Sequence, residues 1–259
     1  MPPFDLEQGK MSVRVSEGVY YQLMADIYDF DFQKQNTFLN KLIPNLVAYR
    51  VEKRRDLRDF LEKNIIHCIK DSFQDKLLYI MDDMFDYAYF DDYRENYHRH
   101  TLHFRLNKEN IINLQAFFNE LQMQNQNKTS YLRNLFNEYA NMRKDKRESL
   151  FFDKECYLIS NAIERKTAIN CMFKNANYTL IPYKIDLNYV DGSLYLIALE
   201  TDNLQACHAF RLCWLRNIII QEMDVPKVDN EITKKLEYII YEYDYTGESN
   251  INLSKLKTD

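Results

Sequence analysis

Glycine is scarce in this chain: the 259 residues include four, at Gly9, Gly18, Gly192 and Gly247. A GxGxxG turn or a Walker-type phosphate loop needs several glycines within a few residues, because the backbone must turn tightly against the phosphates. No stretch of the sequence meets that requirement. Nucleotide-binding enzymes of those two classes are therefore excluded.

Paired cysteines are also lacking. The five cysteines are scattered and never spaced CxxC, which argues against a disulfide framework and against a zinc knuckle. We interpret them as small buried apolar residues in a reducing cytosol. The sequence has no charged leader followed by an apolar run and no apolar stretch of about 18 residues, so we expect a cytoplasmic protein without membrane contact.

Catalytic and metal-binding sets are missing as well. No Ser or Cys has a recognisable base partner, so we expect neither enzyme activity nor a cofactor. Three histidines lie close together, but in a strand His98 and His100 would share one side and His103 would lie on the other. No Cys or carboxylate completes the set, and we expect no bound metal.

The net charge of −5 is divided unevenly along the chain. Residues 10–70 carry 11 Lys and Arg against 8 Asp and Glu, and residues 101–148 carry 8 against 5. Residues 71–100 and 221–259 are acidic, with 3 against 8 and 5 against 9. The two basic stretches are therefore where a polyanion would be tolerated.

The two basic stretches share one pattern, an alternating strand followed by two amphipathic helical segments. A shift of 91 residues takes the first apolar set onto apolar residues again: Val13 to Phe104, Val15 to Leu106, Tyr20 to Ile111, Leu23 to Leu114, Ile27 to Phe118 and Phe30 to Leu121. A shift of 93 residues does the same for the next set: Phe38 to Tyr131, Leu39 to Leu132, Leu42 to Leu135, Ile43 to Phe136 and Leu46 to Tyr139. The sequence therefore predicts two copies of one strand-helix-helix unit, although two amphipathic helix pairs can also match by chance.

This order of strand, cap, helix, turn and helix resembles the ribbon-helix-helix family of DNA-binding proteins, over roughly residues 12–50 and 102–145. In that family two strands, normally from two subunits, form an antiparallel ribbon that lies in the major groove. The resemblance implies a fused pseudo-dimer whose outward strand residues face the bases: Ser12, Arg14, Ser16, His103, Arg105 and Asn107. Arg suits that task because it can bind both guanine acceptors, and Asn can pair with adenine.

The exposed hydrogen-bond donors at the start of each second helix are candidates for holding phosphates. They lie near Lys34 in the first copy and near Lys128 and Thr129 in the second. An ordinary two-stranded sheet with a solvated outer face would carry the same kinds of polar residues, so that alternative stays open.

Residues 50–100 are predicted to form an insertion between the copies. It combines a charged helix over 49–70 with a stretch rich in Asp and Tyr over 75–97. Pro44, in the second helix of the first copy, is expected to bend or shorten that helix because it removes a backbone donor.

The chain changes character after a basic linker at residues 143–147. A helix is predicted over 149–165, and five short β-type runs follow it: 167–173, 178–190, 193–200, 206–212 and 216–221. Short strands with tight turns are typical of a small barrel of SH3 or Sm type.

Four runs in this region resemble the WYL domain: Ile-Pro-Tyr-Lys-Ile at 181–185, Asp-Gly-Ser-Leu-Tyr-Leu-Ile-Ala at 191–198, His-Ala-Phe-Arg-Leu at 208–212 and Arg-Asn-Ile at 216–218. That family is an Sm-like barrel module of bacterial regulators, often attached to a DNA-binding domain and thought to sense nucleic acid or small ligands. Its Trp-Tyr-Leu triplet would fall on residues 194–196, where Leu194 replaces the Trp. The resemblance implies a nucleic-acid surface made by Tyr195, His208, Arg211 and Arg216, with bases stacking on rings and Arg pairing with phosphates. A place in the barrel core is the alternative for Tyr195.

The expected fold class is α+β. A helical region over 12–148 contains the fused ribbon-helix-helix pseudo-dimer, and a small Sm/SH3-like β-barrel follows over 149–225. Residues 226–259 are expected to supply a last helix over 230–245 and a disordered tail.

Three functions are compatible with these features. The first is a transcription regulator with its ribbon in the DNA major groove and its barrel as a sensor of ligand or nucleic acid. The second is an accessory protein that binds single-stranded RNA and modulates a CRISPR effector protein, because WYL proteins with this kind of N-terminal unit resemble accessories of RNA-targeting type VI-D systems. The third is a protein-interaction module that works through the acidic, Tyr-rich segments. Pairing of two chains into a homodimer, through the barrel or the last helix, stays open.

Overall fold

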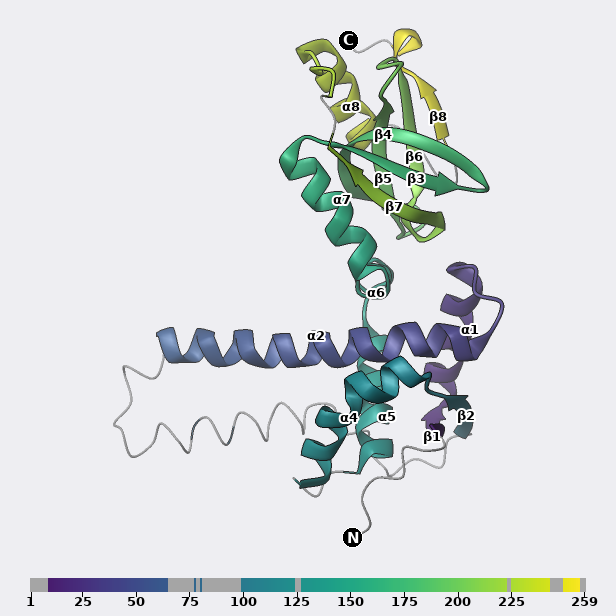
Figure 1. Cartoon of the computed structure of the whole chain (residues 1–259), viewed down its shortest axis with the longest axis vertical. Helices are drawn as coiled ribbons and strands as arrows, with labels where there is room; N and C mark the ends of the chain where they lie inside the picture. Colours follow the sequence, from purple (N-terminus) through teal and green to yellow (C-terminus); the bar gives the residue numbers. More distant parts are fainter. Residues whose placement is uncertain are drawn as a thin grey trace. The chain divides into compact units, whose positions relative to one another are not determined.

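The structure is a computed structural model of the chain, and it describes residues 9–64, 77, 80, 99–123, 127–222, 225–242 and 249–256. It contains two compact units, Met1–Met142 and Arg143–Asp259, called unit 1 and unit 2 below (Figure 1). Helices and antiparallel strands occur in both, which confirms the mixed α+β class. Most of the predicted insertion, with Cys68 and His98, lies outside the described residues. Across the described ranges, no helix is long and apolar enough to cross a membrane.

Unit 1 contains the two strands that the sequence predicts, β1 (Lys10–Ser16) and β2 (Arg99–Arg105), and they pair with each other in an antiparallel sheet. Val13 lies opposite Leu102 in this pair, and both side chains are fully buried. Successive side chains of a strand point to opposite faces, so the apolar alternation gives the sheet one buried face and one open face.

Two helices follow each strand: α1 (Glu17–Asp29) and α2 (Gln35–Asn64) after β1, and α4 (Lys108–Met123) and α5 (Lys128–Asn141) after β2. Ser16 caps α1, because its hydroxyl accepts a hydrogen bond from the Val19 amide. Asn107 does the same for α4 by accepting from the Asn110 amide at 2.7 Å.

The repeated apolar positions form the core of unit 1. The positions on the second helices are all buried: Phe38, Leu39, Leu42, Ile43 and Leu46 of α2, and Tyr131, Leu132, Leu135, Phe136 and Tyr139 of α5. On the first helices, Leu23 and Phe30 are buried together with their equivalents Leu114 and Leu121. The repeated spacing in the sequence therefore corresponds to a repeated pattern of burial.

Pro44 was expected to bend or shorten its helix, and the structure shows that it does not shorten it. α2 continues through Pro44 to Asn64, so the charged helix predicted to begin at residue 49 is the second half of α2. A proline lacks the amide that would bind the carbonyl four residues earlier, here that of Asn40. The Asn110 side chain of α4 donates to this carbonyl at 2.6 Å, which supplies the missing hydrogen bond.

Unit 2 is organised around a six-stranded antiparallel sheet in the order β7-β3-β4-β5-β6-β8. The bounds are β3 Ala168–Phe173, β4 Ala176–Leu187, β5 Leu194–Glu200, β6 Ala206–Arg211, β7 Leu215–Gln221 and β8 Ser249–Asn252. The five predicted strands are all present. The predicted closed barrel is not found, because β7 and β8 are the two edges of an open sheet and do not pair with each other in the described residues.

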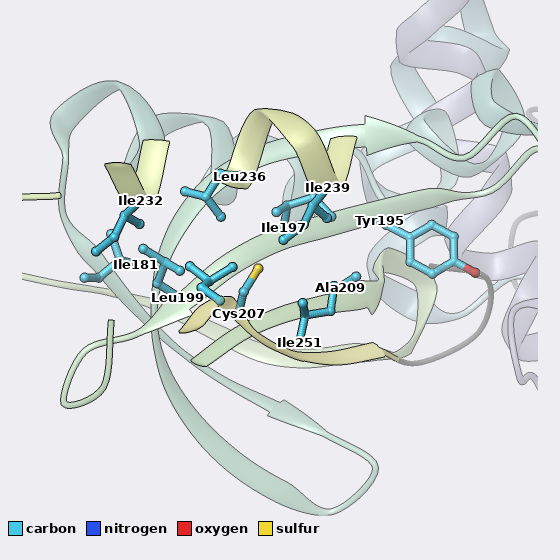
Figure 2. Close-up of a cluster of buried hydrophobic side chains, with 11 residues drawn as sticks. Ile181, Tyr195, Ile197, Leu199, Cys207, Ala209, Ile232, Leu236, Ile239 and Ile251 are labelled. Carbon is cyan, nitrogen blue, oxygen red and sulfur yellow. The ribbon is translucent and has the colours of Figure 1, made fainter. Parts of the chain in front are cut away.

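The sixth strand corrects the expectation of a disordered tail. β8 pairs with β6, and a short 3₁₀ helix, η3 (Leu253–Lys255), follows it. Ile251 and Leu253 from this segment join a buried cluster beneath α8 (Asn230–Glu242), which covers one face of the sheet (Figure 2). The predicted last helix is confirmed, and three of its apolar residues, Ile232, Leu236 and Ile239, face this cluster (Figure 2).

The basic segment 143–147 is not a linker in the structure. It leads into α6 (Lys144–Phe151), and α7 (Asp153–Arg165) follows after a break at Phe152. Glu148 of α6 is fully buried, and its carboxylate accepts hydrogen bonds from the Leu194 amide at 2.8 Å and the Cys213 amide at 3.3 Å. Burial raises the pKa of Glu148, against the opposing effects of these amides and of Arg211.

The raised pKa of Glu148 predicts a pH-dependent contribution to stability. A carboxyl group with a higher pKa in the folded state favours folding below its unfolded pKa, and this contribution is lost as the pH rises through the folded pKa. Relative to Glu148→Gln, the wild-type chain should therefore have its full advantage in stability at and below the ordinary glutamate pKa of 4.5, and lose it as the pH rises further. Urea unfolding at several pH values, followed by the fluorescence of Trp214, the only tryptophan, measures the difference. A difference that does not change with pH would contradict the prediction.

Candidate nucleic-acid interface

Three cross-strand pairs whose side chains are both described lie on the open face of the β1–β2 ribbon: Lys10 with Arg105, Ser12 with His103, and Arg14 with Thr101. Cross-strand partners share a face, so these six side chains lie on the side opposite the buried valines. Five of them are exposed and Thr101 is half-buried. These six side chains comprise three cationic and three other hydrogen-bonding groups, and none of the six is a carboxylate.

The register gives this face an approximate twofold symmetry. The repeat relates Ser12 to His103 by 91 residues, and these two equivalent residues lie directly opposite each other. The same shift relates Arg14 to Arg105 and Lys10 to Thr101, so one outer pair is the symmetry equivalent of the other. The β1 half and the β2 half of the face therefore have an arginine at equivalent positions, Arg14 and Arg105. They differ at the other two positions, where Ser12 corresponds to His103 and Lys10 to Thr101.

The helices cross between the repeats. α2 of the first copy contacts β2 of the second, and α5 of the second contacts β1 of the first. Asn40 Nδ2 of α2 donates to the Arg105 carbonyl at 2.8 Å, and Arg133 Nε of α5 donates to the Arg14 carbonyl at 2.7 Å. Each strand of the ribbon is therefore held by the other copy.

The sequence reasoning found four residues of this face, Ser12, Arg14, His103 and Arg105, and missed two, Lys10 and Thr101. Strand alternation in the sequence predicts both Lys10 and Thr101, because each lies two residues before a residue that was predicted to point outward. Ser16 and Asn107 were predicted to face the bases, and the structure instead engages their side chains in capping α1 and α4.

The two helix starts predicted to hold phosphates differ in the structure. Lys34 is exposed and directly precedes α2. At α5 the Asn127 side chain already accepts from the Thr129 amide at 2.8 Å, so an anion there would compete with the cap. Lys128 is half-buried, and burial lowers its pKa. The start of α2 is therefore the more open of the two.

The residues predicted to form a nucleic-acid surface on unit 2 are mostly inside it. Tyr195 is fully buried and donates to Asp191 at 2.7 Å. His208 is buried, with Nδ1 2.6 Å from Asn250 Oδ1 and Nε2 2.7 Å from Glu200 Oε1. Arg211 is also buried, and Arg216 is half-buried and donates to the Leu215 carbonyl at 2.9 Å. The side chains of Tyr195, His208 and Arg211 are therefore not exposed for contact with bases or phosphates.

Trp214 is an aromatic residue that the sequence reasoning left aside. It lies in the 3₁₀ helix η2 (Leu212–Trp214) and is half-buried. The Lys174 ammonium lies 5.1 Å from its ring centroid and the Arg211 guanidinium 5.2 Å. Two cations against one indole form a cation–π cluster at this end of the sheet.

The cysteines that the structure describes are poorly suited to act as nucleophiles. Burial raises the pKa of the Cys156 and Cys207 thiols to about 12 and that of Cys171 to about 11, and it also raises the pKa of Cys213. These four thiols are therefore protonated at neutral pH and poor nucleophiles. No group of three or more potential metal ligands lies together within the described residues. His100 stacks on Tyr20 beside the buried face, whereas His103 lies on the open one.

Comparisons with known proteins found a likeness among solved structures. No family model matches the sequence, and no curated protein matches it. Among solved structures, the chain is similar to one described as a CRISPR Cas-related protein, with a TM-score of 0.68 and 16% sequence identity. The match covers 93% of this chain and 72% of that one. At this identity the likeness shows a shared fold.

Proposed function

We propose that this chain is a non-catalytic, nucleic-acid-binding regulator that places the β1–β2 ribbon in the major groove of duplex DNA. The open face of the ribbon carries the proposal, because it presents Lys10, Arg14 and Arg105, and the six side chains of its three described cross-strand pairs include no carboxylate. A two-stranded ribbon fits a groove about 12 Å wide. Alternate strand residues lie about 6.8 Å apart, the rise of about two base pairs, so each cross-strand pair can meet its own bases.

The crossed helices support a fused ribbon-helix-helix pseudo-dimer within one chain. Each second helix is docked on the other copy's strand, as expected when two intertwined subunits become one polypeptide. The symmetry of the face is incomplete, because Lys10 corresponds to Thr101 and Ser12 to His103. A DNA site read by this face is therefore expected to be non-palindromic.

A WYL-type, Sm-like module that senses a ligand or nucleic acid is the function proposed for unit 2. The support is the succession of five antiparallel strands in which β7 returns to pair with β3. The open sheet argues against a closed barrel, and the burial of Tyr195, His208 and Arg211 argues against an exposed stacking surface at those residues.

A second candidate is an accessory protein that binds single-stranded RNA and modulates a CRISPR effector protein. The observation in its favour is the structural likeness to a CRISPR Cas-related protein. The same ribbon would serve a different nucleic acid in this case, because its cations attract any phosphate backbone.

The test compares duplex DNA with single-stranded RNA of random sequence by fluorescence anisotropy, using the full chain at several salt concentrations. The proposal predicts tighter binding to the duplex, with log K falling linearly against log salt by about 0.9 for each phosphate contacted. Tighter binding to RNA would favour the second candidate. Absence of binding to both at low salt would overturn both and leave the protein-interaction module.

A further inference from the structure

The backbone of Arg105 is held from the edge of β2 that faces away from β1. Asn36 Oδ1 accepts from the Arg105 amide at 2.7 Å, and Asn40 Nδ2 donates to the Arg105 carbonyl at 2.8 Å. Asn40 Oδ1 also accepts from the Asn107 amide at 2.7 Å. The intervening Leu106 amide points the other way and donates to Gly9 of the paired segment. Two asparagines one helical turn apart on α2 thus bind both backbone polar groups of a residue on the open face.

Asn40 is itself fixed by Asn110, which takes the place of the amide that Pro44 lacks. Pro44 leaves the Asn40 carbonyl without its helical donor, and the buried side chain of Asn110 fills that place at 2.6 Å. The same Asn110 Nδ2 lies 3.1 Å from Asn40 Oδ1. The position of Asn40 is therefore determined by contacts with its own backbone and with its side chain.

The second copy has an equivalent contact with different chemistry. A shift of 93 residues relates Asn40 to Arg133, and a shift of 91 relates Arg14 to Arg105. Arg133 Nε donates to the Arg14 carbonyl at 2.7 Å, so equivalent positions on α5 and α2 bind equivalent carbonyls of the ribbon. One of the two positions carries a charge and the other does not.

We propose that Asn40 and Arg133 are positioning residues that fix the backbones of Arg105 and Arg14 from behind, so that both guanidinium groups project toward the bases. This inference rests on the proposed function. An arginine that binds two guanine acceptors must be held to within about 0.5 Å and 10–20° of its productive geometry, which a side chain on an exposed strand needs outside support to achieve. Asn40 is neutral, so it contributes to discrimination between sequences and not to general attraction to phosphates.

The test uses Asn40→Ala, with Asn113→Ala as the matched control, because Asn113 is an exposed asparagine of α4. The wild-type chain first selects duplexes from a library with 20 randomised base pairs, and the affinities for the selected duplex and for poly(dI-dC) are then measured. Asn40→Ala should lower the preference for the selected duplex by about tenfold, with the poly(dI-dC) affinity and the salt slope unchanged. The control should change neither.

Arg133→Gln is the second variant, because it keeps a donor for the Arg14 carbonyl and removes the charge. It should retain the preference for the selected duplex and lower the affinity for both DNAs by the same small factor. Equal losses on both DNAs with Asn40→Ala would show a merely structural role and overturn the inference, as would an unchanged preference. If the wild-type chain selects no duplex at all, the proposed function fails first and the inference fails with it.

Discussion

A chain carrying both Arg14→Ala and Arg105→Ala is expected to lose about 2–6 kcal/mol of discrimination between its selected duplex and random DNA. A side chain bound to both acceptors of a guanine contributes about 1–3 kcal/mol. The two arginines lie at opposite ends of the open face, in pairs four residues apart along the strands, or about 13.6 Å. At that separation their contributions should be roughly additive. Anisotropy titrations of the single and double variants against both DNAs measure the loss.

The matched control removes the same charge elsewhere in unit 1. Arg55→Ala with Lys63→Ala alters two exposed residues in the second half of α2. It should weaken binding to both DNAs slightly and leave the discrimination intact, because charges remote from the bases contribute through the general field. An equal loss of discrimination in this control, or no loss in the arginine variants, would place the reading surface outside the ribbon.

The ribbon could be predicted from the sequence because its evidence is periodic. Val13 and Val15 alternate in the first copy, Phe104 and Leu106 do so in the second, and the helical stripes repeat at nearly the same offset. Burial follows these positions closely. The continuation of α2 through Pro44 could not be predicted, because the donor that replaces the missing amide comes from Asn110, 66 residues later in the chain. Helix propensity describes single residues and therefore does not include a contact between distant parts of the chain.

The candidate site on unit 2 was predicted less well, for a reason that lies in the sheet. Both faces of β5 and β6 are covered, so alternation gives no sign of which polar or aromatic residues reach solvent. Tyr195 and Phe210 lie on opposite faces, and both are fully buried. His208 is a polar residue bound to Glu200 and Asn250 of neighbouring strands, and Arg211 lies against the Trp214 ring. A sequence does not reveal partners from other strands.

The hydrogen bonds that the helices make to the backbones of Arg14 and Arg105 also connect the fold to its proposed use. Within the residues that the structure describes, the ribbon has two strands only, so neither strand pairs with another strand at its outer edge. Its rigidity depends on the second helices, which bind the outer edges through Asn36, Asn40 and Arg133. A change in either helix is therefore expected to affect the reading face even where it touches no DNA.

The largest expected effect on stability lies in the segment first predicted to be disordered. Leu253 is fully buried in the cluster beneath α8, and its amide donates to the Gln205 carbonyl at 2.8 Å. Leu253→Ala should lower the free energy of unfolding of unit 2 by about 2–5 kcal/mol, through lost apolar burial and the cavity left behind. Urea unfolding followed by Trp214 fluorescence measures this. Lys255→Ala, two residues further along and exposed, should change it by less than about 0.5 kcal/mol. Similar small effects from both variants would mean that β8 and η3 do not belong to the folded core, and that the original expectation of a disordered tail holds in solution.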